Sequence, residues 1–142
     1  MFPEHVRGLV NQGAQFIVNI TNEGWYGDTS VPYQLLAISA FRAVENSIWI
    51  ARASNNGIST FIDPFGRITQ RLRGADGKDL FIDGVLVGEV SRSGGGTFYT
   101  RWGDLFALTQ IGFVLVLSAY AGISRARVFR DHSTKATRGQ AL

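Results

Sequence analysis

The feature that most constrains this chain is an uncharged apolar run near its C-terminus. Residues 105–123, LFALTQIGFVLVLSAYAGI, contain no Asp, Glu, Lys or Arg. A helix of this length spans about 28 Å, close to the roughly 30 Å hydrocarbon core of a bilayer. Thr109, Gln110 and Ser118 weaken the pattern and leave the core helix of a soluble protein as the alternative. We therefore predict one transmembrane helix over residues 104–124.

Basic residues after the run predict its orientation. Residues 125–142 hold one acid, Asp131, against five basic side chains: Arg125, Arg127, Arg130, Lys135 and Arg138. The positive-inside rule places this tail in the cytoplasm and the preceding domain outside it. We expect the tail to be disordered. Tyr99 and Trp102 precede the run and are expected to be aromatic anchors at the membrane interface.

The residues in front of the run predict one folded domain, over 1–103. The chain has 142 residues, of which 45% are hydrophobic, enough for one sizeable core. It contains no cysteine, which excludes a disulfide scaffold, a thiolate metal site and a cysteine nucleophile within this chain. The net charge of +3 comes largely from the tail and leaves no basic stripe for nucleic acid. We expect no metal, no cofactor and no nucleic-acid partner.

A buried strand that runs into a polar loop predicts the site. Residues 16–27, FIVNITNEGWYG, change from an apolar run to a glycine-containing loop. Ligands of open α/β sheets bind outside the carboxyl ends of strands, so Asn22, Trp25 and Tyr26 are candidates for a pocket wall. The alternative is that the two aromatic side chains cap the core. Glu23 is not assigned to catalysis, because a loop carboxylate is usually solvated.

The remaining segments predict a mixed α/β domain. Helices are expected over residues 3–11 and 32–46, each with a proline in its first turn. Asn56-Gly57 predicts a tight hairpin turn, and residues 63–66, DPFG, have the pattern of a type I turn. Further strands are expected over these ranges: 47–53, 58–62, 67–72 and 85–90.

Several of these motifs, in this order, resemble a known family. TNEGWYG, a helix ending FRAVEN, ARASNNGIS, IDPFGRI and TFYTRWGD before an apolar helix are similar to the C-terminal half of the apolipoprotein N-acyltransferases. The resemblance covers nearly the whole chain, from Phe2 to the end of the apolar helix. It implies an α/β fold, a partial nitrilase-like (carbon-nitrogen hydrolase) αββα sandwich followed by one membrane helix, in the bacterial inner membrane.

The resemblance also implies a chemistry. Enzymes of this family transfer an acyl chain from a phospholipid to the N-terminal cysteine amine of a diacylated lipoprotein. A cysteine thiolate, activated by a glutamate and assisted by a lysine, forms a thioester that then acylates the amine.

This chain departs from the family pattern at the catalytic residues. The family's C-Y-E segment lies just before a Phe-Pro pair, here Phe2-Pro3, so the resemblance places the cysteine before Met1, with the lysine and glutamate further upstream. The chain is therefore expected to be a fragment without catalytic residues, inactive by itself, whose partner is a missing N-terminal half.

Other matches to the family pattern are few. Trp25 corresponds to a loop tryptophan that lines the family's substrate pocket, with Asn22 and Tyr26 beside it. Two motifs are expected to be structural, a helix end and a turn, and they comprise Arg42, Glu45, Asn46, Asn55, Asn56 and Gly57. Arg42 and Glu45 are expected to pair on the surface. Two alternatives remain: a fragment of a nitrilase-type amidohydrolase, or a non-catalytic membrane-anchored remnant.

Overall fold

The computed structural model describes residues 1–93 and 96–138, with the side chains of the last helix described as far as Gly122. The chain divides into two units, Met1–Gly103 and Asp104–Leu142. The first unit contains a sheet with the strand order β1-β2-β3-β4. The strands are β1 (Phe16–Asn22), β2 (Trp49–Asn55), β3 (Thr60–Ile62) and β4 (Ile68–Arg71).

Strand pairing places two carboxyl ends at one edge of the sheet. β1 and β2 are parallel, in a register that runs from the Phe16–Trp49 pair to the Asn22–Asn55 pair. Parallel neighbours need a long crossover connection, and here the 3₁₀ turn η1 (Gly24–Tyr26) and helix α2 (Val31–Asn46) supply it. β3 and β4 continue the sheet as an antiparallel meander. The loop after β1 and the turn after β2 therefore lie together.

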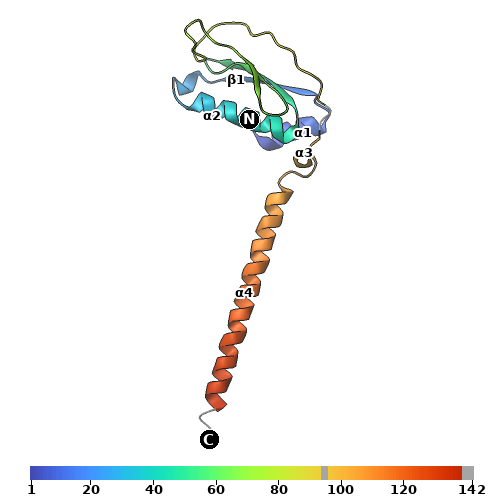
Figure 1. The fold of residues 1–142 in the computed structure, drawn as a ribbon, viewed down its shortest axis with the longest axis vertical. Coiled ribbons are helices and arrows are strands. Elements are labelled where there is room, and N and C mark those ends of the chain that lie inside the picture. Colours follow the sequence, from blue (N-terminus) through green and yellow to red (C-terminus); the bar gives the residue numbers. More distant parts are fainter. Residues whose placement is uncertain (94–95, 139–142) are drawn as a thin grey trace. The chain divides into compact units, whose positions relative to one another are not determined.

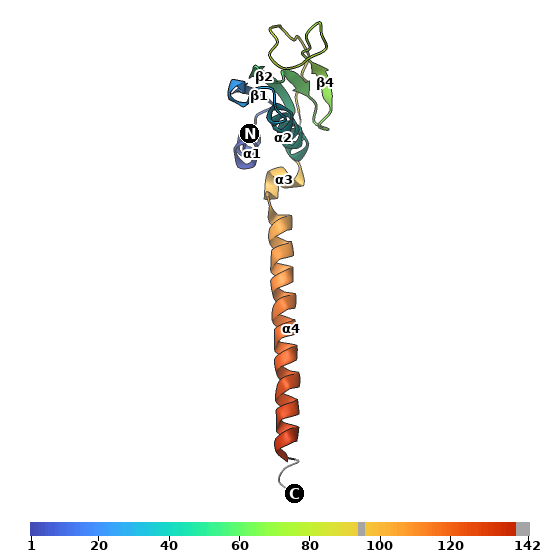
Figure 2. The same ribbon diagram turned by 90° about the vertical axis from the view of Figure 1, so that its left-hand side faces the viewer.

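The core lies between the sheet and two helices. Helix α1 (Pro3–Asn11) has the bounds predicted from the sequence, and α2 begins one residue earlier than predicted. Both helices lie on the same face of the sheet (Figures 1 and 2). Apolar side chains from both layers and from the segments that connect them form the buried core: Val6, Val10, Ile17, Leu36, Ala43, Ile48, Ile50, Ile58, Ile62 and Leu80. The mixed α/β class predicted from the sequence is confirmed.

The opposite face of β1 carries apolar side chains that nothing in the described residues covers well. Side chains alternate between the two faces of a strand, so Ile17 is buried while Phe16, Val18 and Ile20 are exposed. Among the described strands, β1 pairs only with β2. One helical layer and one sheet correspond to half of an αββα sandwich.

Residues 85–90 correct one prediction, because they form no strand. Val85 and Val87 are exposed. Gly88 faces side chains of the sheet, since a β-carbon there would lie 2.7 Å from the Phe61 ring and 2.6 Å from Gln70 Oε1. A strand needs backbone partners for its N–H and C=O groups, and contact through side chains does not supply them.

The second unit is built on one long helix, α4 (Leu105–Arg138). Its window Leu105–Gly122 has a mean hydropathy of 1.8, and none of its residues is buried. By length and composition, this part of α4 is able to cross a membrane. The helical backbone of α4 extends to Arg138, and disorder of the tail from residue 125 stays a prediction. Residues 139–142 of the predicted tail lie outside the described residues.

A buried carboxylate, Asp63, holds the turn between β3 and β4. Its Oδ1 accepts the backbone N–H groups of Phe65 and Arg67, each at 2.9 Å, and its Oδ2 accepts Arg67 Nε at 2.7 Å. Burial raises the pKa of Asp63, but the hydrogen bonds from Arg67 and Phe65 outweigh it, so the pKa lies below its ordinary value. The hydrogen bond from Gly66 N to Asp63 O, at 2.9 Å, closes the predicted turn.

Asp63→Asn is expected to lower the free energy of unfolding at pH 7 by about 1 to 2 kcal/mol, because a charge-assisted hydrogen bond is lost. A carboxyl whose pKa is lowered by folding stabilises the fold above its unfolded pKa of about 3.9 and ceases to do so as the pH falls through its folded pKa. The difference between variant and parent in urea unfolding should therefore shrink below pH 4. Asp83→Asn, at an exposed carboxyl, is the control. An equal difference at pH 7 and pH 3 would contradict this role.

Candidate functional site

The loop after β1 is held against the end of β2 by asparagine side chains. Asn22 Oδ1 accepts the backbone N–H of Gly24 at 3.1 Å and Asn55 Nδ2 at 3.4 Å. A β-carbon on Gly24 would lie 3.0 Å from Asn56 Nδ2. The structure thus brings Asn22, Asn55 and Asn56, predicted separately from two motifs, to one edge of the sheet.

The aromatic side chains of this loop point away from the core. Trp25 is 85% exposed and Tyr26 is about half exposed. The interpretation that they cap the core is therefore wrong. The loop after β1 therefore exposes an indole and a phenol near the hydrogen-bonded amides of Asn22 and Asn55. Whether this surface is the wall of a substrate site stays a prediction.

Glu23 lies inside the protein, contrary to the expectation of a solvated loop carboxylate. Its side chain is 1% exposed and forms an ion pair through Oε1 with Arg52 Nη2, whose side chain is 2% exposed. Glu23 follows β1 directly, and its backbone N–H donates to Asn55 O at 3.1 Å. The loop that presents Trp25 is therefore fixed on one side by a buried charge.

Arg52 is surrounded by acceptors from three segments. Besides Glu23, Nε donates to Ile58 O at 3.2 Å and Nη1 donates to Ser39 Oγ at 3.0 Å. Ser39 Oγ in turn donates to Leu35 O on α2 at 3.0 Å. Burial lowers the pKa of the Arg52 guanidinium from its ordinary value, but arginine remains charged at neutral pH. A single cation therefore ties together the loop, the hairpin and the helix.

Gly57 is packed directly on this ion pair. A β-carbon at Gly57 would overlap Glu23 Oε2 and Ser54 Oγ. Both of these buried oxygens lack a hydrogen-bond partner among the described residues. Asn56, the preceding turn residue, has φ of 60°, a conformation that asparagine tolerates. The Asn-Gly pair is thus required for close approach as well as for the turn.

The motif at the end of α2, which comprises Arg42, Glu45 and Asn46, makes contacts inside the fold. Arg42 Nη2 donates to Glu45 Oε1 at 2.8 Å in a pair that is partly buried, whereas a surface pair was expected. Asn46 is buried, and its Nδ2 donates to Arg42 O at 3.1 Å. Its Oδ1 accepts Thr100 Oγ1 at 3.2 Å, which joins the end of α2 to helix α3 (Phe98–Trp102).

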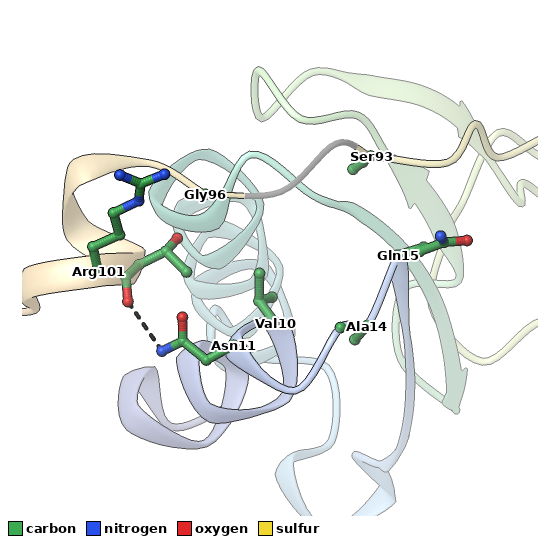
Figure 3. Close-up of a pocket in the computed structure, with 9 residues that line it drawn as sticks. Val10, Asn11, Ala14, Gln15, Ser93, Gly96 and Arg101 are labelled. Atoms are coloured by element: carbon green, nitrogen blue, oxygen red, sulfur yellow. Dashed lines mark hydrogen bonds between the residues drawn. The ribbon is translucent and has the colours of Figure 1, made fainter.

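A cavity of about 400 Å³ lies at the other end of β1 (Figure 3). Its lining includes Val10, Asn11, Gln15 and Arg101. Gln15 precedes β1, so this cavity is at the amino end of the strand and away from Trp25. Among the described residues, no group of three or more His, Asp or Glu side chains is placed to hold a metal ion.

Comparison with known proteins identifies the fold's family. Residues 1–98 match the carbon-nitrogen hydrolase family. The chain belongs to the carbon-nitrogen hydrolase family. The sheet, α1, α2 and the loop with Trp25 all fall within the matched residues.

This member of the carbon-nitrogen hydrolase family is similar to proteins named apolipoprotein N-acyltransferase. It is 43% identical to that of Geobacter metallireducens over 121 residues, which cover 85% of this chain and 22% of the relative. It is 37% identical to that of Rickettsia bellii over 119 residues, 83% of this chain and 22% of the relative. It is 39% identical to that of Azotobacter vinelandii over 102 residues, which cover 72% of this chain and 18% of the relative. The chain thus spans about one fifth of the length of these relatives.

The buried Glu23–Arg52 pair of this carbon-nitrogen hydrolase chain was missed from the sequence, although a signal for it is present. Arg52 is two residues after Ile50 in a strand, so the two side chains share the buried face. A charged side chain at a core position needs a buried partner. That requirement indicates a buried acid near Arg52, and the pairing of β1 with β2 in the structure identifies the acid as Glu23.

Proposed function

We propose that this chain is part of an apolipoprotein N-acyltransferase. The enzyme would move an acyl chain from a phospholipid, through a cysteine thioester, to the N-terminal cysteine amine of a diacylated lipoprotein. The relatives' names and the motif resemblance support this proposal. The hydrolase-like unit would lie outside the cytoplasm, with α4 in the membrane and its C-terminal end in the cytoplasm.

One observation favours this function over a soluble amidohydrolase. A match of 121 residues cannot fit within residues 1–98, so the similarity to the Geobacter relative continues past the hydrolase domain into α4. The apolar window Leu105–Gly122 lies in that continuation. A soluble amidohydrolase does not need an apolar helix that is long enough to cross a membrane.

The residues of this chain would bind the substrate and would not form the covalent intermediate. The chain has no cysteine, so the thiolate that forms the thioester must come from another part of the protein. The exposed Trp25 and Tyr26 offer apolar surface to an acyl chain, and Asn22, paired with Asn55, holds the backbone of their loop. The buried Glu23–Arg52 pair would keep this loop in place.

A chimera tests the proposal. This chain replaces the matching part of the Geobacter enzyme, and the membrane protein is supplied with phospholipid and a diacylated lipopeptide. The chimera should yield triacylated product by mass spectrometry, whereas the chain by itself should yield none. A chimera that is abundant, folded and inactive would instead favour the non-catalytic remnant, for which the absence of cysteine is the supporting observation. Product from the isolated chain would contradict the thioester mechanism.

Trp25→Ala in that chimera is expected to reduce acyl transfer at least about tenfold while leaving its abundance unchanged. The indole is mostly exposed, so its loss does not create the cavity that costs about 3 to 5 kcal/mol at a buried tryptophan. Phe65→Ala, at another exposed aromatic, is the matched control and should retain activity. Activity that falls only in step with abundance would show that Trp25 has no role at the substrate.

A further inference from the structure

Helix α3 presents two aromatic side chains on the surface of the first unit. Phe98 is 63% exposed and Trp102 is 60% exposed. Their rings are stacked, with centroids 6.5 Å apart and planes inclined by 30°. Tyr99, predicted as an anchor together with Trp102, is only partly exposed. The structure therefore pairs Trp102 with Phe98 on the exposed side.

The other side of α3 is fastened to the folded domain. Thr100 is buried, and its carbonyl oxygen accepts Arg7 Nε at 3.0 Å and Asn11 Nδ2 at 3.1 Å; the Asn11 bond is the dashed line in Figure 3. Its hydroxyl donates to Asn46 Oδ1 at 3.2 Å. Thr97 caps the helix, and its hydroxyl donates to Glu45 O. A helix of five residues is thus held by bonds to both α1 and α2.

The sequence after α3 indicates what covers the aromatic pair. Trp102 is three residues before Leu105, where the apolar window begins. Three residues reach at most about 11 Å, so insertion of the window keeps Trp102 near the boundary of the hydrocarbon. Tryptophan is enriched at that boundary. Tryptophan and phenylalanine are typical of the lipid-facing side of interfacial helices, and a basic side chain such as the exposed Arg101 is attracted to anionic lipids.

We propose that Phe98 and Trp102 insert into the lipid headgroup region, so that α3 docks the hydrolase-like domain on the membrane surface. This inference rests on the membrane setting of the proposed function. The aromatic side chains supply the contact with lipid, and the bonds to Arg7, Asn11 and Asn46 transmit it to the domain. The domain then keeps a fixed height above the bilayer instead of moving freely on a tether.

The fluorescence of Trp102 reports directly whether its side chain contacts lipid. The full chain carrying Trp25→Phe and Trp49→Phe retains one tryptophan and is reconstituted in vesicles of phosphatidylethanolamine and phosphatidylglycerol. Its emission should be shifted to the blue, quenched by lipids brominated near the headgroup, and several-fold less sensitive to aqueous acrylamide than free tryptophan. An inserted chain with water-like, acrylamide-accessible emission would overturn the inference alone. Failure of the chain to enter the vesicles would contradict the proposed function as well.

A label on the domain tests whether α3 fixes its height. Because the chain has no native cysteine, Ala37→Cys on the exposed side of α2 gives a single labelling site. Energy transfer from this label to headgroup acceptors should fall when Phe98 and Trp102 are both changed to Ser. Val85→Ser, at an exposed apolar side chain outside α3, should leave the transfer unchanged. Equal transfer in the parent and the double variant would overturn the docking.

Discussion

Arg52→Leu is expected to lower the free energy of unfolding of the first unit by about 3 to 5 kcal/mol, enough to unfold a marginally stable domain. The substitution removes the partner of Glu23 and leaves a carboxylate in a site that is 1% exposed. Glu23 Oε2 already lacks a hydrogen-bond partner among the described residues, so no second contact compensates. Urea unfolding of the detergent-solubilised chain, followed by near-ultraviolet circular dichroism, measures the loss.

Two further variants separate the buried charge from the loss of one contact. Glu23→Leu combined with Arg52→Leu should recover much of the lost stability, because neither charge is then left buried without a partner. Arg67→Leu removes an arginine whose side chain is mostly exposed in its pair with Asp63, and should cost no more than about 1 kcal/mol. If Arg52→Leu were no more harmful than Arg67→Leu, the pair would not hold the loop.

Val114→Arg is expected to oppose membrane insertion of α4 by about 2.5 to 3.5 kcal/mol, a shift of about a hundredfold between inserted and non-inserted chains. Val114 lies near the middle of Leu105–Gly122, where a guanidinium is farthest from either aqueous surface. Carbonate extraction of bacterial membranes and a reporter fused to the C-terminus measure insertion and orientation. The parent should resist extraction with its reporter in the cytoplasm.

Val114→Leu is the matched control for this experiment, since it alters the side chain without adding charge. It should behave as the parent does. Recovery of the parent chain in the soluble fraction, or equal insertion of the Val114→Arg and Val114→Leu chains, would contradict a membrane-spanning α4.

The sequence was sufficient wherever one local pattern determines the structure. The 3.6-residue period and Pro3 defined α1, and Asn56-Gly57 and Asp63-Pro64 marked the turns. Features that depend on contacts between distant parts of the chain were harder to predict from the sequence. Residues 85–90 have the apolar composition of a short strand, but within the described residues they belong to no strand ladder, and ladder formation depends on the course of the whole chain.

The candidate site was likewise predicted in part. The end of β1 follows from the change of pattern at Asn22, but that pattern left open whether Trp25 is exposed, as in the structure, or caps the core. The burial of Glu23 was not predicted either, because it depends on Arg52, 29 residues further along the chain. Parallel pairing of β1 with β2 is what brings the two together, and no local spacing in the sequence encodes that pairing.

The uncovered side of β1 has a practical consequence for anyone preparing this chain. Phe16, Val18 and Ile20 form an apolar stripe on the exposed face of β1, which is also an edge strand of the described sheet. An exposed, apolar edge strand promotes edge-to-edge association of sheets. Cutting away α4 would therefore not yield a well-behaved soluble domain. A detergent or a supplied neighbouring strand has to shield β1 as well. Replacing Val18 by a charged residue is a simpler way to reduce this association for biophysical work.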